Sequence, residues 1–142
     1  MTAASTDDVI DDMLASTRRI AVVGLSDRRW RDSHGVAAAL QRRGWEIIPV
    51  NPDVDEVLGV PAVDSLADID GDVDLVDVFR RPEFLPDVAR EAVAIGAGGI
   101  FVQLGLRSDE ARETAREAGI PYVENRCLKV EVLRRDAVAP TD

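Results

Sequence analysis

The chain has 142 residues, of which 46% are apolar, and this is enough for one domain with a substantial core. Its apolar runs are too short to span a bilayer, and the segment 1–12 lacks the basic flank and apolar stretch of a signal peptide. One cysteine and one histidine exclude a disulfide framework and argue against a zinc site. We therefore expect one cytoplasmic domain over 1–142, without a metal, with loose ends at about 1–4 and 137–142.

Charge narrows the classes of partner. Seventeen basic and 27 acidic side chains give a net charge of −10, which repels nucleic acid and anionic membranes. Lys129 is the only lysine, so the other basic residues are all arginines. Two explanations of this acidic, lysine-poor composition stay open: the codon bias of a GC-rich genome, and adaptation to a high-salt cytoplasm.

Strand and helix patterns alternate along the chain. Continuous apolar runs typical of buried parallel strands occupy 19–24, 45–50, 74–79 and 100–104, with shorter strands expected at 60–63 and 121–124. Between these strands, periodic apolar positions predict helices over 7–17, 33–43, 82–95, 108–118 and 128–135. Ser5 or Thr6 is expected to cap the first helix, Ser33 the second and Ser108 the fourth, and Pro82 suits the first turn of the third.

This alternation predicts an α/β fold. Right-handed βαβ units give a doubly wound, mostly parallel sheet of five to six strands, with helices on both faces. We expect the strand order 3-2-1-4-5-6, with strand 3 short. Ligands of such sheets bind outside the carboxyl ends of the strands, where the strand order reverses. The loops that follow Gly24, Val50, Phe79 and Leu104 are therefore expected to surround one cleft.

The loop after the first strand suits a phosphate. Gly24 allows a close approach of the backbone, Ser26 adds a hydroxyl, and the next helix offers free N–H groups. Arg28, Arg29 and Arg31 concentrate positive charge there, in a chain that is strongly acidic overall. A merely solvated basic loop is the alternative, but the position at the expected reversal of strand order favours phosphate contact.

The standard dinucleotide fingerprints are absent. In the pattern G-x-G-x-x-G, Ser26 stands at the second glycine and Arg29 at the third. The second strand ends in Val50-Asn51-Pro52, without the acidic residue that would hold a free ribose diol. The P-loop lysine is missing as well. These departures argue against NAD, whereas the arginines leave NADP open.

Several segments together resemble a known family, the small stand-alone CoA-binding proteins. These share the Rossmann-like CoA-binding domain found at the N-terminus of the succinyl-CoA synthetase α subunit. The matching segments, in family order, are IAVVGLS (20–26), RDSHGVAAALQRRGW (31–45), IIPVNP (47–52), EVLGVPAVDSLADI (56–69), DLVDVFRRPE (74–83), FVQLG (101–105) and NRCLKVE (125–131). Each piece alone is weak, but the series is specific and runs from about residue 8 to residue 135.

The resemblance implies a set of residues that contact coenzyme A or an acyl-CoA. It places Gly24 and Ser26 at the pyrophosphate, Arg28 or Arg31 on phosphate groups, Asn51 and Pro52 beside the adenosine, Phe79, Arg80 and Pro82 along the cleft, and Gln103 and Gly105 near the pantetheine. The full candidate set also includes Leu25, Ser33 and Val50. Two departures from the family pattern are Asp53, where larger relatives have lysine after Asn-Pro, and Phe101-Val102, where an aromatic residue, usually tryptophan, commonly precedes the Q-x-G piece.

The sequence thus favours a non-catalytic CoA-binding domain, because no set of acid, base and nucleophile stands out. Two alternatives stay open. One is an NADP-binding oxidoreductase or redox sensor, and the sequence also leaves open whether Cys127, beside Arg126, is a buried, inert cysteine or a reactive thiol near the CoA site. The other is a CoA-handling subunit that acts with a separate partner chain. No nucleic acid or membrane partner is expected, and a homo-oligomer is compatible with the sequence.

Overall fold

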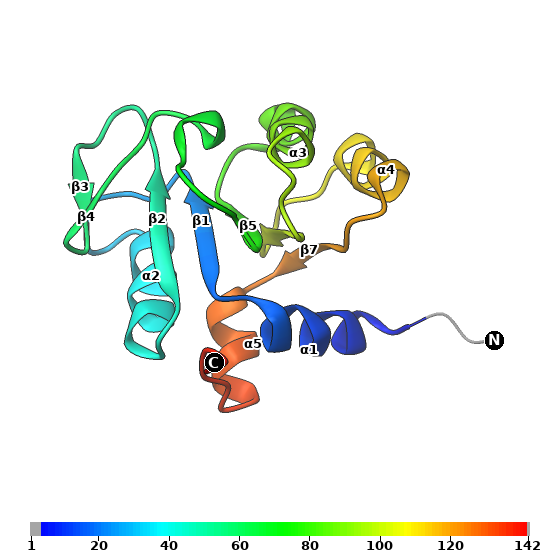
Figure 1. Cartoon of the computed structure of the whole chain (residues 1–142), viewed down its shortest axis with the longest axis horizontal. Coiled ribbons are helices and arrows are strands. Elements are labelled where there is room, and N and C mark those ends of the chain that lie inside the picture. The colour runs from blue at the N-terminus through cyan, green and yellow to red at the C-terminus, as the bar shows by residue number, and fades with distance from the viewer. Residues whose placement is uncertain (1–3, 142) are drawn as a thin grey trace.

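The structure, a computed structural model, describes residues 4–141. These residues form five helices, seven strands and two short 3₁₀ turns (Figure 1). Their bounds are α1 Thr6–Ser16, β1 Arg19–Val23, α2 Asp32–Arg42, β2 Glu46–Val50, β3 Glu56–Val57, β4 Val60–Pro61, η1 Leu66–Asp68, β5 Leu75–Val78, η2 Pro82–Phe84, α3 Leu85–Ala94, β6 Ile100–Gln103, α4 Asp109–Ala118, β7 Tyr122–Arg126 and α5 Leu128–Arg134.

The main sheet confirms the predicted fold class. It has five strands, all parallel to their neighbours, in the order β2-β1-β5-β6-β7. The chain leaves β1 toward β2 on one side and returns to β5 on the other, so the strand order reverses beside β1. This is the doubly wound topology, and it places the carboxyl ends of β1, β2 and β5 side by side.

The short third strand of the predicted order is reduced to one residue. Val63 forms a parallel bridge with Val50, supported by a hydrogen bond from the Asn51 N–H to the Val63 carbonyl at 2.9 Å. The residues just before it form the small antiparallel hairpin β3–β4 instead. Leu58 and Gly59 make its tight turn, both with positive φ, of 55° and 78°. The hairpin pairs Val60 and Pro61 with β3 and not with β2, so the main sheet has five full strands.

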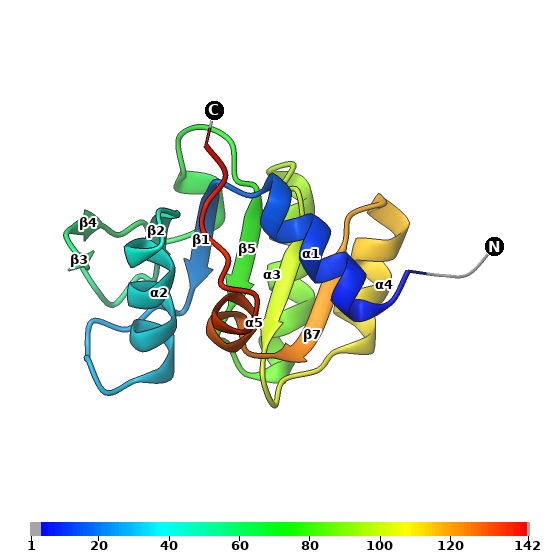
Figure 2. The same ribbon diagram turned by 90° about the horizontal axis from the view of Figure 1, so that it is seen from below.

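Helices cover both faces of the sheet. Figure 1 shows α1, α2 and α5 on one face and α3 and α4 on the other, and Figure 2 shows the same layers from below. Each strand alternates its buried side chains between the two layers. The first core lies under α1, α2 and α5 and includes Trp45 and Phe101; the second lies under α3 and α4 and includes Val76 and Val78.

Helix ends partly follow the predicted caps. Ser5 caps α1 through a 3.1 Å hydrogen bond from the Asp8 N–H, and Ser108 caps α4 through the Ala111 N–H, as predicted. Ser33 does not cap α2. The cap position belongs to Arg31, and Ser33 lies within the first turn, where its hydroxyl serves the preceding loop.

The first residues of the expected loose end over 137–142 are hydrogen-bonded to the end of α2. The Ala139 N–H donates to the Arg43 carbonyl at 3.0 Å, and the Arg43 guanidinium donates to the Ala137 carbonyl at 3.0 Å. These bonds fasten residues 137–139 to the end of α2, because α2 and α5 pack side by side. Of the other residues expected to be loose, 1–3 and 142 lie outside the described part of the chain.

Candidate functional site: a cleft at the carboxyl ends of the strands

A polar cleft lies where β1, β2 and β5 end. Two adjoining hollows of about 500 and 420 Å³ share Gly24, Arg31 and Phe79. The larger is lined by Gly24, Arg31, Val50, Asn51, Pro52, Asp53, Phe79, Arg80, Arg81 and Phe84, and the smaller by Gly24, Trp30, Arg31, Asp32, Ser33 and Phe79. The cleft therefore combines the loops after three neighbouring strands, whereas the loop after Leu104, which was also expected there, lines neither hollow.

Gly24 makes the floor of this cleft. It follows β1 with φ of +86°, and a Cβ added there would lie 2.3 Å from the Phe79 carbonyl oxygen. The Gly24 N–H donates to the Val50 carbonyl at 2.9 Å, and the Phe79 N–H donates to the Val23 carbonyl at 2.9 Å. The absence of a side chain at Gly24 thus lets the ends of β1, β2 and β5 close on one another.

The loop between β1 and α2 is held by two serine hydroxyls. The Ser26 N–H donates to the Ser33 Oγ at 3.0 Å, and the Arg28 N–H donates to the Ser26 Oγ at 3.1 Å. Both hydroxyls therefore shape the loop that leads to Arg31. Arg31 itself lines both hollows and occupies the N-cap of α2, where no side chain caps the helix.

Asn51 braces the opposite wall. Its Nδ2 donates to the Leu25 carbonyl at 3.0 Å, and its Oδ1 accepts the Asp53 N–H at 2.9 Å. The amide thus fixes both the Gly24–Leu25 turn and the turn after β2. Leu25 has no exposed surface and packs in the first core, so its part in the cleft is limited to its backbone.

Two cleft residues that sequence reasoning missed are Arg81 and Phe84. The helix predicted over 82–95 begins instead with a 3₁₀ turn over Pro82–Phe84, and this turn leaves Phe84 38% exposed. The Arg80 guanidinium carbon lies 4.3 Å from the centre of the Phe84 ring, a cation–π contact that holds both side chains at the mouth of the cleft. The number of residues per turn differs between the 3₁₀ turn and the α-helix, which changes the direction of the side chains. No feature of the sequence marks where one geometry gives way to the other here.

The cleft is the place where an acidic protein gathers positive charge. Arg31, Arg80 and Arg81 line the larger hollow, opposed there by the carboxylate of Asp53. Arg28 lines neither hollow, and its guanidinium carbon lies 5.9 Å from the centre of the Trp30 ring. Among the lining residues that the structure describes, there is no cysteine or histidine. The arrangement suits binding of an anion and contains no nucleophile–base pair.

The remaining predicted site residues lie outside the two hollows. Pro82 is exposed in the 3₁₀ turn before α3. Gln103 ends β6, and its Oε1 is buried without a hydrogen-bond partner. The Gly105 N–H donates to the Asn125 Oδ1 at 2.7 Å, which joins the loop after β6 to β7. Cys127 is half-buried at the cap of α5 and packs against the first core.

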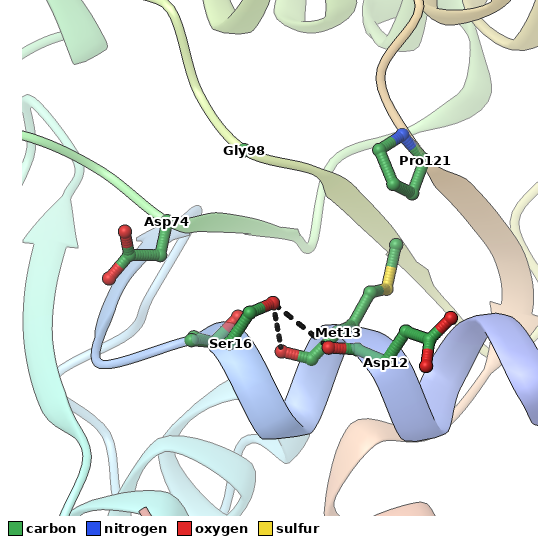
Figure 3. A pocket seen from close by; sticks show the side chains of 7 residues that line it. Asp12, Met13, Ser16, Asp74, Gly98 and Pro121 are labelled. Carbon is green, nitrogen blue, oxygen red and sulfur yellow. Dashed lines mark hydrogen bonds between the residues drawn. The ribbon is translucent and has the colours of Figure 1, made fainter. Parts of the chain in front are cut away.

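A separate hollow of about 240 Å³ lies at the opposite end of the sheet, between α1 and the amino ends of the strands (Figure 3). Two of its polar side chains are engaged in hydrogen bonds within the protein. The Ser16 hydroxyl donates to the Asp12 carbonyl at 2.9 Å, and the Asp74 carboxylate accepts the N–H groups of Arg18 and Arg19. Ligands of doubly wound sheets bind at the other end, so this hollow is not the candidate site.

Residues 4–141 contain neither a metal-binding cluster nor a membrane-spanning helix. No group of three His, Cys, Asp or Glu side chains is arranged to hold a metal ion. None of the helices in this range has the length and hydropathy needed to cross a membrane.

The fold and the cleft define a doubly wound α/β protein with an arginine-lined cleft where its strand order reverses. Comparison with known proteins makes the class specific: the sequence pattern of the CoA binding domain matches residues 18–132. The chain belongs to this family.

Named relatives agree with this membership. The chain is 50% identical over 121 residues to the uncharacterized protein YneT of Bacillus subtilis, covering 85% of this chain and 90% of that one. It is 22% identical over 121 residues to an ADP-forming acetate–CoA ligase of Methanocaldococcus jannaschii, covering 80% of this chain but only 17% of the ligase. The chain thus corresponds to one part of that larger protein.

Solved structures share the fold over nearly the whole chain. A protein of Thermus thermophilus is 38% identical, with a TM-score of 0.86, covering 92% of this chain and 98% of that one. A hypothetical protein of Pyrococcus horikoshii is 33% identical, with a TM-score of 0.87, covering 94% of this chain and 98% of that one.

Proposed function

We propose that the chain binds coenzyme A or an acyl-CoA in the cleft at the carboxyl ends of β1, β2 and β5. The observation that carries the proposal is the cleft of about 500 Å³ lined by Arg31, Arg80 and Arg81 in a protein of net charge −10. A polyanion needs such a local reversal of charge, and arginine forms strong contacts with phosphate. Family membership supports CoA as the polyanion.

In this proposal the pyrophosphate lies over Gly24, beside Arg31 and the first N–H groups of α2. The adenosine lies against Asn51 and Pro52, and the pantetheine arm runs over the ends of β5 and β6 toward Gln103. The side chains of Ser26 and Ser33 shape the loop, since hydrogen bonds within the protein already engage both. We infer a binding role without catalysis by this chain alone, in the cytoplasm. Any group transfer would then need a separate partner chain.

A second candidate ligand, a dinucleotide with a free ribose diol, is favoured by Asp53. The end of β2 itself has no acidic residue, but the Asp53 carboxylate lines the cleft three residues further on, near the position at which such proteins bind the diol. The same carboxylate would repel the 3′-phosphate of CoA. Asp53 therefore distinguishes the two candidates.

Replacing Arg31 with alanine is expected to weaken CoA binding by roughly ten- to a hundredfold, because charge-assisted contacts to phosphate are strong. Dephospho-CoA should lose affinity by the same factor, since the position of Arg31 beside Gly24 suits the pyrophosphate. Arg42→Ala is the matched control. Arg42 is exposed in the last turn of the same helix, about 15 Å from its start. If calorimetric titration shows that both variants bind CoA as tightly as the parent, the phosphates bind elsewhere.

Replacing Asp53 with asparagine is expected to raise the affinity for CoA a few-fold, because a like charge beside the 3′-phosphate is removed. Binding of dephospho-CoA, which lacks that phosphate, should change less. Asp55→Asn serves as the control, because Asp55 is exposed and outside the cleft lining. The dinucleotide would be supported instead if the parent does not bind CoA and if the Asp53→Asn variant binds NAD more weakly than the parent does.

A further inference from the structure

Three side-chain oxygens in residues 4–141 are buried without a hydrogen-bond partner: both carboxyl oxygens of Asp77 and the Oε1 of Gln103. Asp77 lies in β5, the central strand of the sheet, and has no exposed surface. Buried polar atoms are almost always hydrogen-bonded, so such a group needs an explanation. The proposed contacts of the ligand give Asp77 no role.

The two residues share one face of the sheet. Along β5, Leu75 belongs to the first core, whereas Val76 and Val78 belong to the second, so the alternation directs Asp77 toward the first core. Asp77 pairs in register with Phe101 of β6, another member of the first core. Gln103 follows two residues later on the same face. It is thus the diagonal neighbour of Asp77, within reach of a long side chain.

The chemistry of the two groups is complementary. Complete burial raises the pKa of the Asp77 carboxyl to about 8, so the group carries a proton at neutral pH. A neutral carboxyl has one O–H to donate, and the Gln103 Oε1 can accept it. Gln103 stands at the carboxyl end of β6, on the side of the cleft beyond β5, whose end supplies Phe79 and Arg80.

We propose that Asp77 is a positioning residue of the ligand site, which donates a hydrogen bond to the Gln103 Oε1 and thereby turns the Gln103 NH₂ group toward an amide carbonyl of the ligand. The proposal rests on the proposed function and adds Asp77 to the site. Asp77 acts only through Gln103, because its own side chain is fully enclosed. An ionised Asp77 would accept a hydrogen bond instead, and the Gln103 NH₂ group would then turn inward.

The test compares CoA with 3′-phospho-ADP, which keeps the three phosphates of CoA and lacks its amide-containing arm. Asp77→Val and Gln103→Leu are each expected to weaken CoA roughly three- to tenfold, with the double variant no weaker than either single one. None of the three should weaken 3′-phospho-ADP. Asp77→Asn keeps a donor in place and should restore most of the CoA affinity.

The proposal is overturned if Asp77→Val binds CoA like the parent, if it weakens both ligands equally, or if the two losses add. These outcomes are distinguishable from failure of the proposed function, in which the parent itself would bind neither ligand. Valine suits this buried strand, so the variant is expected to fold; melting curves of each variant establish that it has.

A pH profile gives a second readout that a purely structural role would not move. The CoA affinity of the parent should fall above about pH 8 relative to that of Asp77→Asn. Both proteins bind the same thiol-bearing ligand and share all other titrating groups, so only Asp77 distinguishes their pH profiles. The buried side chains of α1 are apolar, and those of α2 are apolar except for Ser33, whose hydroxyl does not titrate in this range. From α5, the buried charged group is Glu131, which is paired with Arg126, Arg134 and Arg135. Cys127 also packs against this core. Parallel profiles for the two proteins would contradict the role of the Asp77 proton.

Discussion

Replacing Gly24 with alanine is expected to lower the free energy of unfolding by roughly 2–4 kcal/mol and to abolish measurable CoA binding. The new Cβ would lie 2.3 Å from the Phe79 carbonyl oxygen, and φ at this position is +86°. The atom that it meets is backbone, tied into the sheet by the hydrogen bond from the Phe79 N–H to the Val23 carbonyl. The clash can therefore be relieved only if β1 and β5 separate at their carboxyl ends, and this separation opens the floor of the cleft.

Gly59→Ala is the matched control. Gly59 also has a positive φ, of 78°, but a Cβ there would have no neighbour within 4 Å. Its substitution should therefore lower the free energy of unfolding only through the strain of a positive φ, by about 1 kcal/mol, and leave ligand binding unchanged. Chemical denaturation of both variants, with calorimetric titration where each is folded, measures the difference. Equal losses of stability would show that the contact with Phe79 is easily relieved.

Asp77 is expected to make the protein less stable as pH rises. The unfolded carboxyl ionises near pH 3.8, whereas the buried group keeps its proton to about pH 8. Between these values the native state binds more protons than the unfolded state, so the free energy of unfolding falls by roughly 1.4 kcal/mol per pH unit from this group. Below pH 3.8 the effect is absent, and above about pH 8 it levels off.

The measurement is denaturant unfolding of the parent and of Asp77→Val from pH 4 to pH 8. The valine variant should be the more stable of the two at pH 8 by several kcal/mol, with the gap growing steadily from pH 4. Asp70→Asn, at an exposed aspartate, should follow the parent across the range. A gap that is constant with pH would mean that Asp77 does not hold its proton in the native state.

The sequence predicts the layers of this fold because buried parallel strands need continuous apolar runs, and β1, β2, β5 and β6 have them. It does not predict the β3–β4 hairpin, since Leu58-Gly59 lacks the Asn-Gly or Asp-Gly signal that usually marks such a turn. Without the hairpin, the segment 60–63 has the composition of one short strand. Only Val63 pairs with the sheet in that way.

The cleft was predicted more completely in its backbone than in its side chains. Topology alone placed the ends of β1, β2 and β5 together, and with them Gly24, Asn51 and Phe79. Ser33 had the sequence position of a helix cap, but its hydroxyl accepts from Ser26 because the loop closes back onto α2. The presence of Arg81 in the cleft depends on local turn geometry, which apolar periodicity does not encode.

The most direct test of the central claim is calorimetric titration of the unmodified protein with CoA, with NADP and NAD titrated under the same salt conditions. We expect CoA to bind saturably with one site per chain, and at least ten times more tightly than either dinucleotide. An absence of CoA binding, or tighter binding of a dinucleotide, would contradict the assignment of this cleft to CoA.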